Sequence, residues 1–149
     1  MSTVREVLDT KGNDVWSVAA SRTVHEAITI MVEKNVGALI VSNEHSQLAG
    51  IISERDCVRR VMLEKKSATD TPVEVIMTKD VVVAHEDTNT DVCMSLLSGH
   101  GIRHLPVMKG RTPVGIVTVG DLMKFTIEEQ AMTIEELQSF IFVEEGGEG

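Results

Sequence analysis

Two short stretches of the chain combine a hydroxyl and a carboxylate at a spacing that could hold a sugar phosphate. Residues 50–56 read Gly-Ile-Ile-Ser-Glu-Arg-Asp, and residues 115–121 read Gly-Ile-Val-Thr-Val-Gly-Asp. Each pattern predicts a buried strand that ends on Ser or Thr, followed by a helix with Asp in its first turn. The free amides and positive potential of a helix N-terminus attract anions. We therefore expect Ser53 with Asp56, and Thr118 with Asp121, to line two binding sites for a phosphate and a ribose.

Both carboxylates also have a plainer interpretation. An Asp in the first turn stabilises a helix by about 0.5–1 kcal/mol without any ligand. The recurrence of glycine, hydroxyl and carboxylate at the same offsets in two places favours the binding hypothesis. Arg103 and His104 leave a similar choice, because they could be exposed residues at a strand edge or could face a phosphate.

The two stretches recur about 65 residues apart, within a longer duplication of predicted elements. Hydrophobic periodicity predicts a strand, a helix, two strands and a helix in each copy. One copy of roughly 50 residues would struggle to cover its own sheet. We therefore predict an α/β (α+β) fold in which two repeats pack around a pseudo-twofold axis. The predicted strands are 15–18, 36–41, 47–53, 81–84, 103–108 and 113–118, and the main helices begin near residues 24, 54, 89 and 119.

Short helices are predicted outside these repeats. Thr3, Thr71 and Thr133 each stand three positions before a Glu, which is the capping-box pattern of a helix start. They predict helices at 3–9, at 72–77 with Pro72 in its first position, and at 133–142. The chain then divides into an N-terminal helix and turn (1–13), a first repeat (14–65), a linker with a short helix (66–79), a second repeat (80–127), and a C-terminal helix with an acidic tail that we expect to fray (128–149).

Composition and the remaining reactive side chains argue against several function classes. The formal net charge of −9 argues against nucleic-acid binding, which needs a basic surface. No apolar run approaches membrane-spanning length and no signal peptide is evident, so we expect a cytoplasmic protein without membrane insertion. Cys57 and Cys93 are too few for a disulfide framework and fall on apolar helix faces. Gly101 separates His100 from His104, so no metal site is expected, and no catalytic triad or carboxylate pair is supported.

The duplicated stretches resemble tandem cystathionine-β-synthase-type (CBS) domains, the Bateman module. Residues 36–41, Val-Gly-Ala-Leu-Ile-Val, and 101–107, Gly-Ile-Arg-His-Leu-Pro-Val, match the other signature strand of that family. The resemblance covers roughly residues 14–127, and the flanks are similar to those of stand-alone bacterial CBS-pair proteins. It implies β-α-β-β-α CBS repeats that form a disk-like homodimer. It also implies regulatory adenosine ligands, namely AMP, ADP, ATP or NAD, and sometimes S-adenosylmethionine, with no catalytic cofactor.

The same resemblance implies roles for individual residues. In the second-repeat site, Asp121 would hold the ribose, Thr118 would contact a phosphate, and the backbone beside Val81 and Val82 would meet the adenine. The first-repeat site would be weaker, because it has Gly37 and Ala38 where the second repeat has cationic side chains, although Arg55, Arg59 or Lys124 could supply charge. The expected site residues are Asp121, Thr118, Arg103, His104, Ile116, Val81 and Val82 for the second repeat, and Asp56, Ser53, Gly37, Ala38, Ile51 and Arg55 for the first.

The function implied is a non-enzymatic sensor. An adenine nucleotide that bridges the repeats would shift the population of their relative orientations, and an unidentified enzyme or transporter would respond. The alternative is a protein-interaction module whose clefts have lost their ligand and that docks on an enzyme or transporter. A melting-curve response to nucleotides would separate these two hypotheses.

Overall fold

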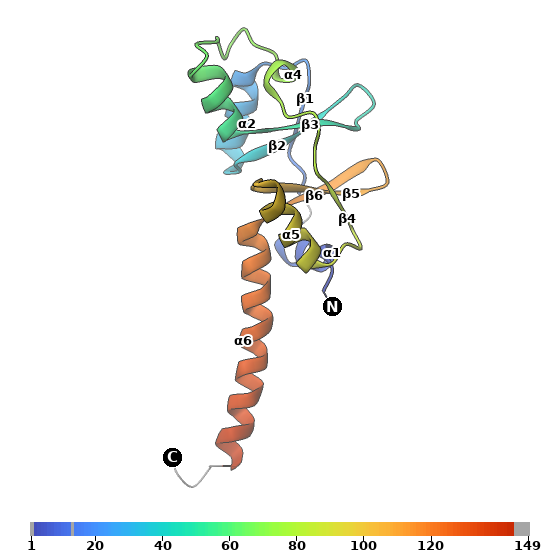
Figure 1. The fold of residues 1–149 in the computed structure, drawn as a ribbon, viewed down its shortest axis with the longest axis vertical. Helices are drawn as coiled ribbons and strands as arrows, with labels where there is room; N and C mark the ends of the chain where they lie inside the picture. Colours follow the sequence, from blue (N-terminus) through green and yellow to red (C-terminus); the bar gives the residue numbers. More distant parts are fainter. Residues whose placement is uncertain (1, 13, 145–149) are drawn as a thin grey trace.

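The structure is a computed structural model that describes residues 2–12 and 14–144, with side chains as far as residue 131. It contains two three-stranded sheets with helices packed against them, one sheet from each half of the chain. Figure 1 shows the two sheets facing each other and a long C-terminal helix extending away from them. The predicted α/β (α+β) class with two β-α-β-β-α repeats is confirmed.

The two repeats have the same order of elements. The first contains β1 (Ser17–Ala19), α2 (Val24–Lys34), β2 (Ala38–Ser42), β3 (Leu48–Ser53), α3 (Glu54–Cys57) and a π-helical turn η1 (Val58–Met62). The second contains β4 (Ala84–His85), α5 (Thr90–His100), β5 (His104–Lys109), β6 (Thr112–Thr118) and α6 (Val119–Glu144). In each sheet the first strand is parallel to the second and the second is antiparallel to the third.

Two short helices outside the repeats are exchanged between them. Helix α1 (Val4–Lys11) buries Val4, Val7 and Leu8 in the core of the second repeat. Helix α4 (Val73–Ile76), which lies between the repeats in sequence, buries Val73 and Ile76 in the core of the first. Each repeat therefore packs against the apolar face of a short helix that precedes the other repeat in the sequence.

A glycine in each β-hairpin allows the chain to approach the sheet closely. A Cβ on Gly50 would lie 2.6 Å from the carbonyl oxygen of Thr78 and 2.8 Å from the sulfur of Met77. Thr78 pairs with Ile51 through two backbone hydrogen bonds of 3.0 and 2.9 Å. A Cβ on Gly115 would lie 2.6 Å from a methyl carbon of Leu8. These contacts hold Met77 and Thr78 against β3, and Leu8 of α1 against β6.

The prediction of two separate C-terminal helices was wrong. The structure has one helix, α6, from Val119 to Glu144, in place of separate helices after residue 119 and at 133–142. The chain carries no Gly or Pro from 121 to 144, so nothing in the backbone ends the first helix before Thr133. The Thr133 capping box therefore lies inside a helix that has already begun. The expected fraying of the tail beyond Glu144 lies outside the described residues.

Several other boundaries differ from the prediction. Strand β4 holds only Ala84 and His85, so residues 81–83 of the predicted strand lie outside it. Pro72 is the N-cap of α4 instead of its first helical residue, and Thr3 caps α1 without a side-chain hydrogen bond. One helix was predicted to begin near residue 54. The structure has one α-helical turn from Glu54 to Cys57, followed by a π-helical turn from Val58 to Met62 in which Leu63 N donates to Val58 O.

The two cysteines are structural core residues. Cys57 and Cys93 are both buried and unbridged. Burial raises the pKa of each thiol to about 11, with help at Cys57 from the nearby Asp56 and Glu54 carboxylates. Thiolate chemistry at neutral pH is therefore suppressed at both positions. Within the described part of the chain, no helix has the length and apolarity needed to cross a membrane.

Candidate functional site: two clefts between the repeats

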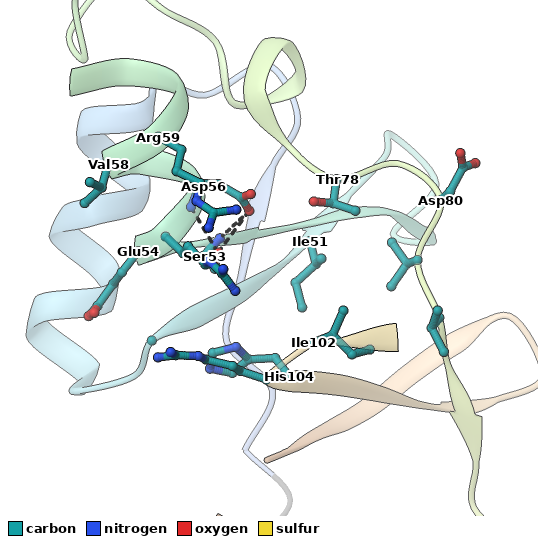
Figure 2. A pocket seen from close by; sticks show the side chains of 16 residues that line it. Ile51, Ser53, Glu54, Asp56, Val58, Arg59, Thr78, Asp80, Ile102 and His104 are labelled. Carbon is teal, nitrogen blue, oxygen red and sulfur yellow. Dashed lines mark hydrogen bonds between the residues drawn. The ribbon is translucent and has the colours of Figure 1, made fainter. Parts of the chain in front are cut away.

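The repeats enclose two clefts. The larger, with a cavity volume of about 590 Å³, is called the Asp56 cleft here, and its polar lining includes Ser53, Asp56, Arg55, Arg59 and Arg103. Figure 2 shows Ser53, Asp56 and Arg59 on one side of this cleft and Ile102 and His104 on the other. The smaller, of about 400 Å³, is called the Asp121 cleft, and its lining includes Thr118, Asp121, Lys11, Asp14 and Trp16.

The hydroxyl and carboxylate of the Asp56 cleft form a capping box. Ser53 Oγ accepts a hydrogen bond from Asp56 N at 3.2 Å, and Asp56 Oδ2 accepts from Ser53 N and Ser53 Oγ at 3.0 Å each. All these bonds to the carboxylate fall on one oxygen, and among the described residues Oδ1 has no hydrogen-bond donor. The cap therefore fixes the orientation of Asp56 and leaves an oxygen free to accept from hydroxyl groups of a ligand.

Thr118 and Asp121 repeat this geometry at the start of α6. Thr118 Oγ1 accepts from Asp121 N at 3.1 Å, and Asp121 Oδ2 accepts from Thr118 N at 2.9 Å. Asp121 also has a partner that Asp56 lacks. Lys11 Nζ, at the end of α1, lies 2.6 Å from Asp121 Oδ2 and 2.6 Å from the carbonyl oxygen of Ile116. Both carboxylates cap their helices, which agrees with the plainer interpretation. Both also line a cleft, as the binding hypothesis expects.

Positive charge is concentrated in the Asp56 cleft. Arg55, Arg59 and Arg103 line it, and within the described part of the chain none of the three has a carboxylate within 4.0 Å. Glu54, Asp56 and Asp80 also line this cleft, so its lining holds three carboxylates beside the three arginines. In the Asp121 cleft the arginines are missing, and Lys11 is already paired. Of the two clefts, the Asp56 cleft is therefore the one in which an anionic group would find uncommitted guanidinium donors among the described residues.

The structure regroups the expected site residues. Arg103, Val81 and Val82, expected beside Asp121, line the Asp56 cleft instead. Ala38, expected beside Asp56, lines the Asp121 cleft. Ser53, Asp56, Ile51 and Arg55 do lie together, as do Thr118, Asp121 and Ile116, whereas Gly37 and His104 line both clefts.

The regrouping concerns the start of β5. His104, the first residue of this strand, pairs with Thr118 of its own repeat and lines both clefts. Arg103 lies in the bend just before the strand and lines the Asp56 cleft, beside residues of the first repeat. Of the residues considered as other sources of charge for the first-repeat site, Arg55 and Arg59 line this cleft and Lys124 does not, and Arg103 is added from the second repeat.

His104 forms the wall between the two clefts. A Cβ on Gly37 would lie 3.2 Å from His104 Nε2, so the ring packs closely against the first repeat at this position. Burial lowers the pKa of His104 below its ordinary value of 6.5, and the positive charges of Lys11 and Arg103 add to this, against Glu54 and Asp121. The imidazole is therefore neutral at neutral pH.

This pKa predicts how stability depends on pH. Because the pKa of His104 is depressed in the folded state, the unfolded chain takes up the proton first as the pH falls. The free energy of unfolding should therefore decrease as the pH falls through 6.5, until the folded-state pKa is passed. Urea denaturation between pH 7.5 and 5.5 should show a smaller decrease for His104→Asn than for the unmodified chain. His45→Asn, in an exposed turn, should keep the full decrease, and equal decreases in both variants would contradict the assignment.

Several residues of the Asp121 cleft were missed from the sequence, among them Lys11 and Trp16. Trp16 lies just before β1 as Val82 lies just before β4, so the duplication itself carried the signal for Trp16. Nothing in the sequence pattern pairs Lys11 with Asp121, which are 110 positions apart. Among the described residues, no group of three or more His, Cys, Asp or Glu side chains is arranged to hold a metal ion.

Two similar repeats pack together, with a capped carboxylate in each of the two clefts between them. The family model of the CBS domain matches residues 4–63 and 73–128. The chain therefore belongs to the CBS-domain family, as a tandem CBS pair.

Relatives and solved structures agree with this assignment. The chain is 32% identical over 149 residues to the mitochondrial CBS domain-containing protein CBSX3 of Arabidopsis thaliana, covering 94% of this chain and 72% of the relative. A putative signal-transduction protein with CBS domains from Burkholderia ambifaria superposes with a TM-score of 0.81 at 39% identity, covering 87% of this chain and 96% of that one. The CBS domain pair of protein MJ0100, in complex with 5′-methylthioadenosine and S-adenosyl-L-methionine, has a TM-score of 0.77 at 28% identity, covering 87% and 98%.

Proposed function

We propose that this CBS pair is a non-enzymatic sensor that binds an adenine nucleotide in the Asp56 cleft. The ribose hydroxyls would donate to Asp56, whose Oδ1 has no donor among the described residues. The phosphate would be held by Arg103 with Arg55 or Arg59, and the adenine would lie along Val81 and Val82. A cavity of about 590 Å³ has room for a ligand of this size.

One observation carries the proposal. In a chain of net charge −9, three arginines line one cleft without an internal carboxylate partner in the described part of the chain. Arginine pairs readily with carboxylates and prefers bidentate contact with carboxylate or phosphate. Guanidinium groups beside a carboxylate that is oriented toward a cavity favour a ligand with both hydroxyls and an anionic group. The adenosine ligands in the complex of the MJ0100 domain pair are consistent with this class.

The proposed output is a change in how the repeats sit against each other. Ser53 and Asp56 come from the first repeat and Arg103 and His104 from the second, so a bound nucleotide would contact both. It would favour the orientation in which both sets reach it. We propose that a regulated enzyme or transporter in the cytoplasm responds to that shift.

We also propose that the module acts as a homodimer. The π-turn and the start of α6 expose large apolar side chains, with Met62 72%, Leu63 74% and Ile127 58% accessible. Exposed apolar groups of this size favour an interface. Val58 is also exposed, whereas Leu122 is buried in the core of the second repeat and Phe125 packs partly against it.

Calorimetric titration with AMP tests the proposed site. Asp56→Asn keeps an acceptor for the Ser53 amide but removes the charge, and it is expected to weaken AMP binding by at least about tenfold, the usual cost of a lost hydrogen bond to a charged group. Asp70→Asn, in the exposed linker, is the matched control and should bind as the unmodified chain does. If AMP, ATP, NAD and S-adenosylmethionine all fail to bind or to raise the melting temperature, the sensor proposal is wrong, and the alternative of a ligand-free interaction module is favoured.

A further inference from the structure

Lys11 gives the Asp121 cleft a feature that the Asp56 cleft lacks. Its ammonium group lies 2.6 Å from Asp121 Oδ2, the carboxylate oxygen that also accepts from the Thr118 amide. The side chains of Lys11 and Asp121 remain 35% and 26% exposed, so the pair sits at the cleft surface where a ligand can reach it. Lys11 is the last residue of α1, the helix that precedes both repeats in the sequence and packs against the second.

The Asp56 cleft is the internal comparison. There, Asp56 has the same capping geometry, but within the described residues no ammonium or guanidinium lies within 4.0 Å of its carboxylate. Thr78 has the same place in the Asp56 cleft as Gly12 has in the Asp121 cleft. Met77, which precedes Thr78, is therefore the counterpart of Lys11, which precedes Gly12. Met77 is buried against Gly50 and carries no charge. The ion pair is therefore particular to one cleft.

We propose that Lys11 makes the Asp121 cleft selective for phosphorylated ribonucleosides by exchanging its ion-pair partner. The inference rests on the proposed function, since it assumes that these clefts accept adenosine ligands. Ribose hydroxyls that take both oxygens of the Asp121 carboxylate displace the ammonium from Oδ2 and leave it the carbonyl oxygen of Ile116. A ligand phosphate then supplies a new anionic partner, whereas an unphosphorylated nucleoside supplies none.

The charges around this cleft make Lys11 the deciding group. The other ionisable side chains lining it are Asp14, which opposes an anion, and His104, which is neutral because its pKa is depressed. Arg103, Arg55 and Arg59 line the other cleft. Loss of Lys11 should therefore affect a nucleoside and a nucleotide in opposite directions. For the nucleoside it removes a competitor for Asp121, and for the nucleotide it removes the cation that pairs with phosphate.

Trp16 allows this cleft to be observed separately. It is the single tryptophan of the chain and lines the Asp121 cleft, and the lining of the Asp56 cleft does not include it. Lys34 lies over its ring, 4.4 Å from the ring centroid, and does not line the cleft. Trp16 fluorescence therefore reports ligands in the Asp121 cleft, and Lys34→Met is a control for removing a positive charge close to the reporter.

The test is a pair of Trp16 fluorescence titrations with AMP and with adenosine. The unmodified chain should prefer AMP by about 30-fold, the range of a hydrogen-bonded charge pair. In Lys11→Met that preference should fall to about threefold or less, with adenosine binding more tightly and AMP more weakly. Lys11→Arg should retain the preference and Lys34→Met should leave it unchanged. Melting curves should show that all variants remain folded.

Other outcomes would overturn the proposal. Equal gains for both ligands in Lys11→Met would make Lys11 a simple competitor, and an unchanged preference would make it a structural residue only. If Trp16 does not respond in any variant while calorimetry still detects AMP binding that depends on Asp56, this inference fails and the proposed function stands. If neither method detects an adenosine ligand, both fail.

Discussion

Replacing Arg103 with alanine is expected to weaken AMP binding by about 30-fold, or about 2 kcal/mol, the usual value of a hydrogen-bonded contact to a charged group. Arg103 lines the Asp56 cleft from the second repeat and has no carboxylate partner within 4.0 Å in the described part of the chain. Its loss should therefore remove a ligand contact without breaking an internal ion pair. Stability should change little, because the side chain is exposed.

Calorimetric titration with AMP and with adenosine measures this effect. The affinity for AMP should fall and the affinity for adenosine in the same cleft should stay within about threefold, because a phosphate contact is worth little to a ligand without phosphate. Arg111→Ala removes an equal charge from the exposed turn between β5 and β6 and should leave both affinities unchanged. A loss of AMP affinity in Arg111→Ala as large as in Arg103→Ala would mean that net charge, and not a contact in the cleft, governs binding.

The largest effect on stability is expected for Gly50→Ala, with a decrease of about 3 kcal/mol in the free energy of unfolding. The new Cβ would lie 2.6 Å from the carbonyl oxygen of Thr78, in a segment held to Ile51 by two backbone hydrogen bonds. A backbone carbonyl cannot turn away as a side chain can. Because Thr78 also lines the Asp56 cleft, AMP affinity should decrease together with stability.

Two other glycines provide matched comparisons in urea denaturation. Gly115→Ala places its Cβ equally close to Leu8, but against the end of a flexible side chain, so a decrease of about 1 kcal/mol is expected. Gly99→Ala, inside α5, meets nothing within 4 Å and should raise stability by about 0.5–1 kcal/mol. Equal losses for Gly50→Ala and Gly115→Ala would show that contact with the backbone is not what matters at Gly50.

Local patterns in the sequence were sufficient to predict the two capped carboxylates. Ser53 with Asp56, and Thr118 with Asp121, form their hydrogen bonds across three residues, so spacing alone specifies them. The same is true of the repeat order, because each strand and helix carries its own periodicity. The continuity of α6 was missed because a capping pattern marks a possible helix start and cannot show that the preceding residues are already helical.

The grouping of residues into clefts depends on how the repeats face each other. The resemblance placed Arg103 beside Asp121 of its own repeat, whereas Arg103 lines the cleft of Asp56, which is 47 positions earlier in the chain. Lys11 reaches Asp121 only because α1 packs on the second repeat. Such contacts between distant segments leave no periodic signal in a single sequence.

A crystal structure of the chain with one equivalent of AMP tests the central claim most directly. We predict the ribose hydroxyls on the Asp56 carboxylate and the phosphate against the Arg103 guanidinium, with the adenine beside Val81 and Val82. Nucleotide found in the Asp121 cleft while the Asp56 cleft remains empty would contradict the account.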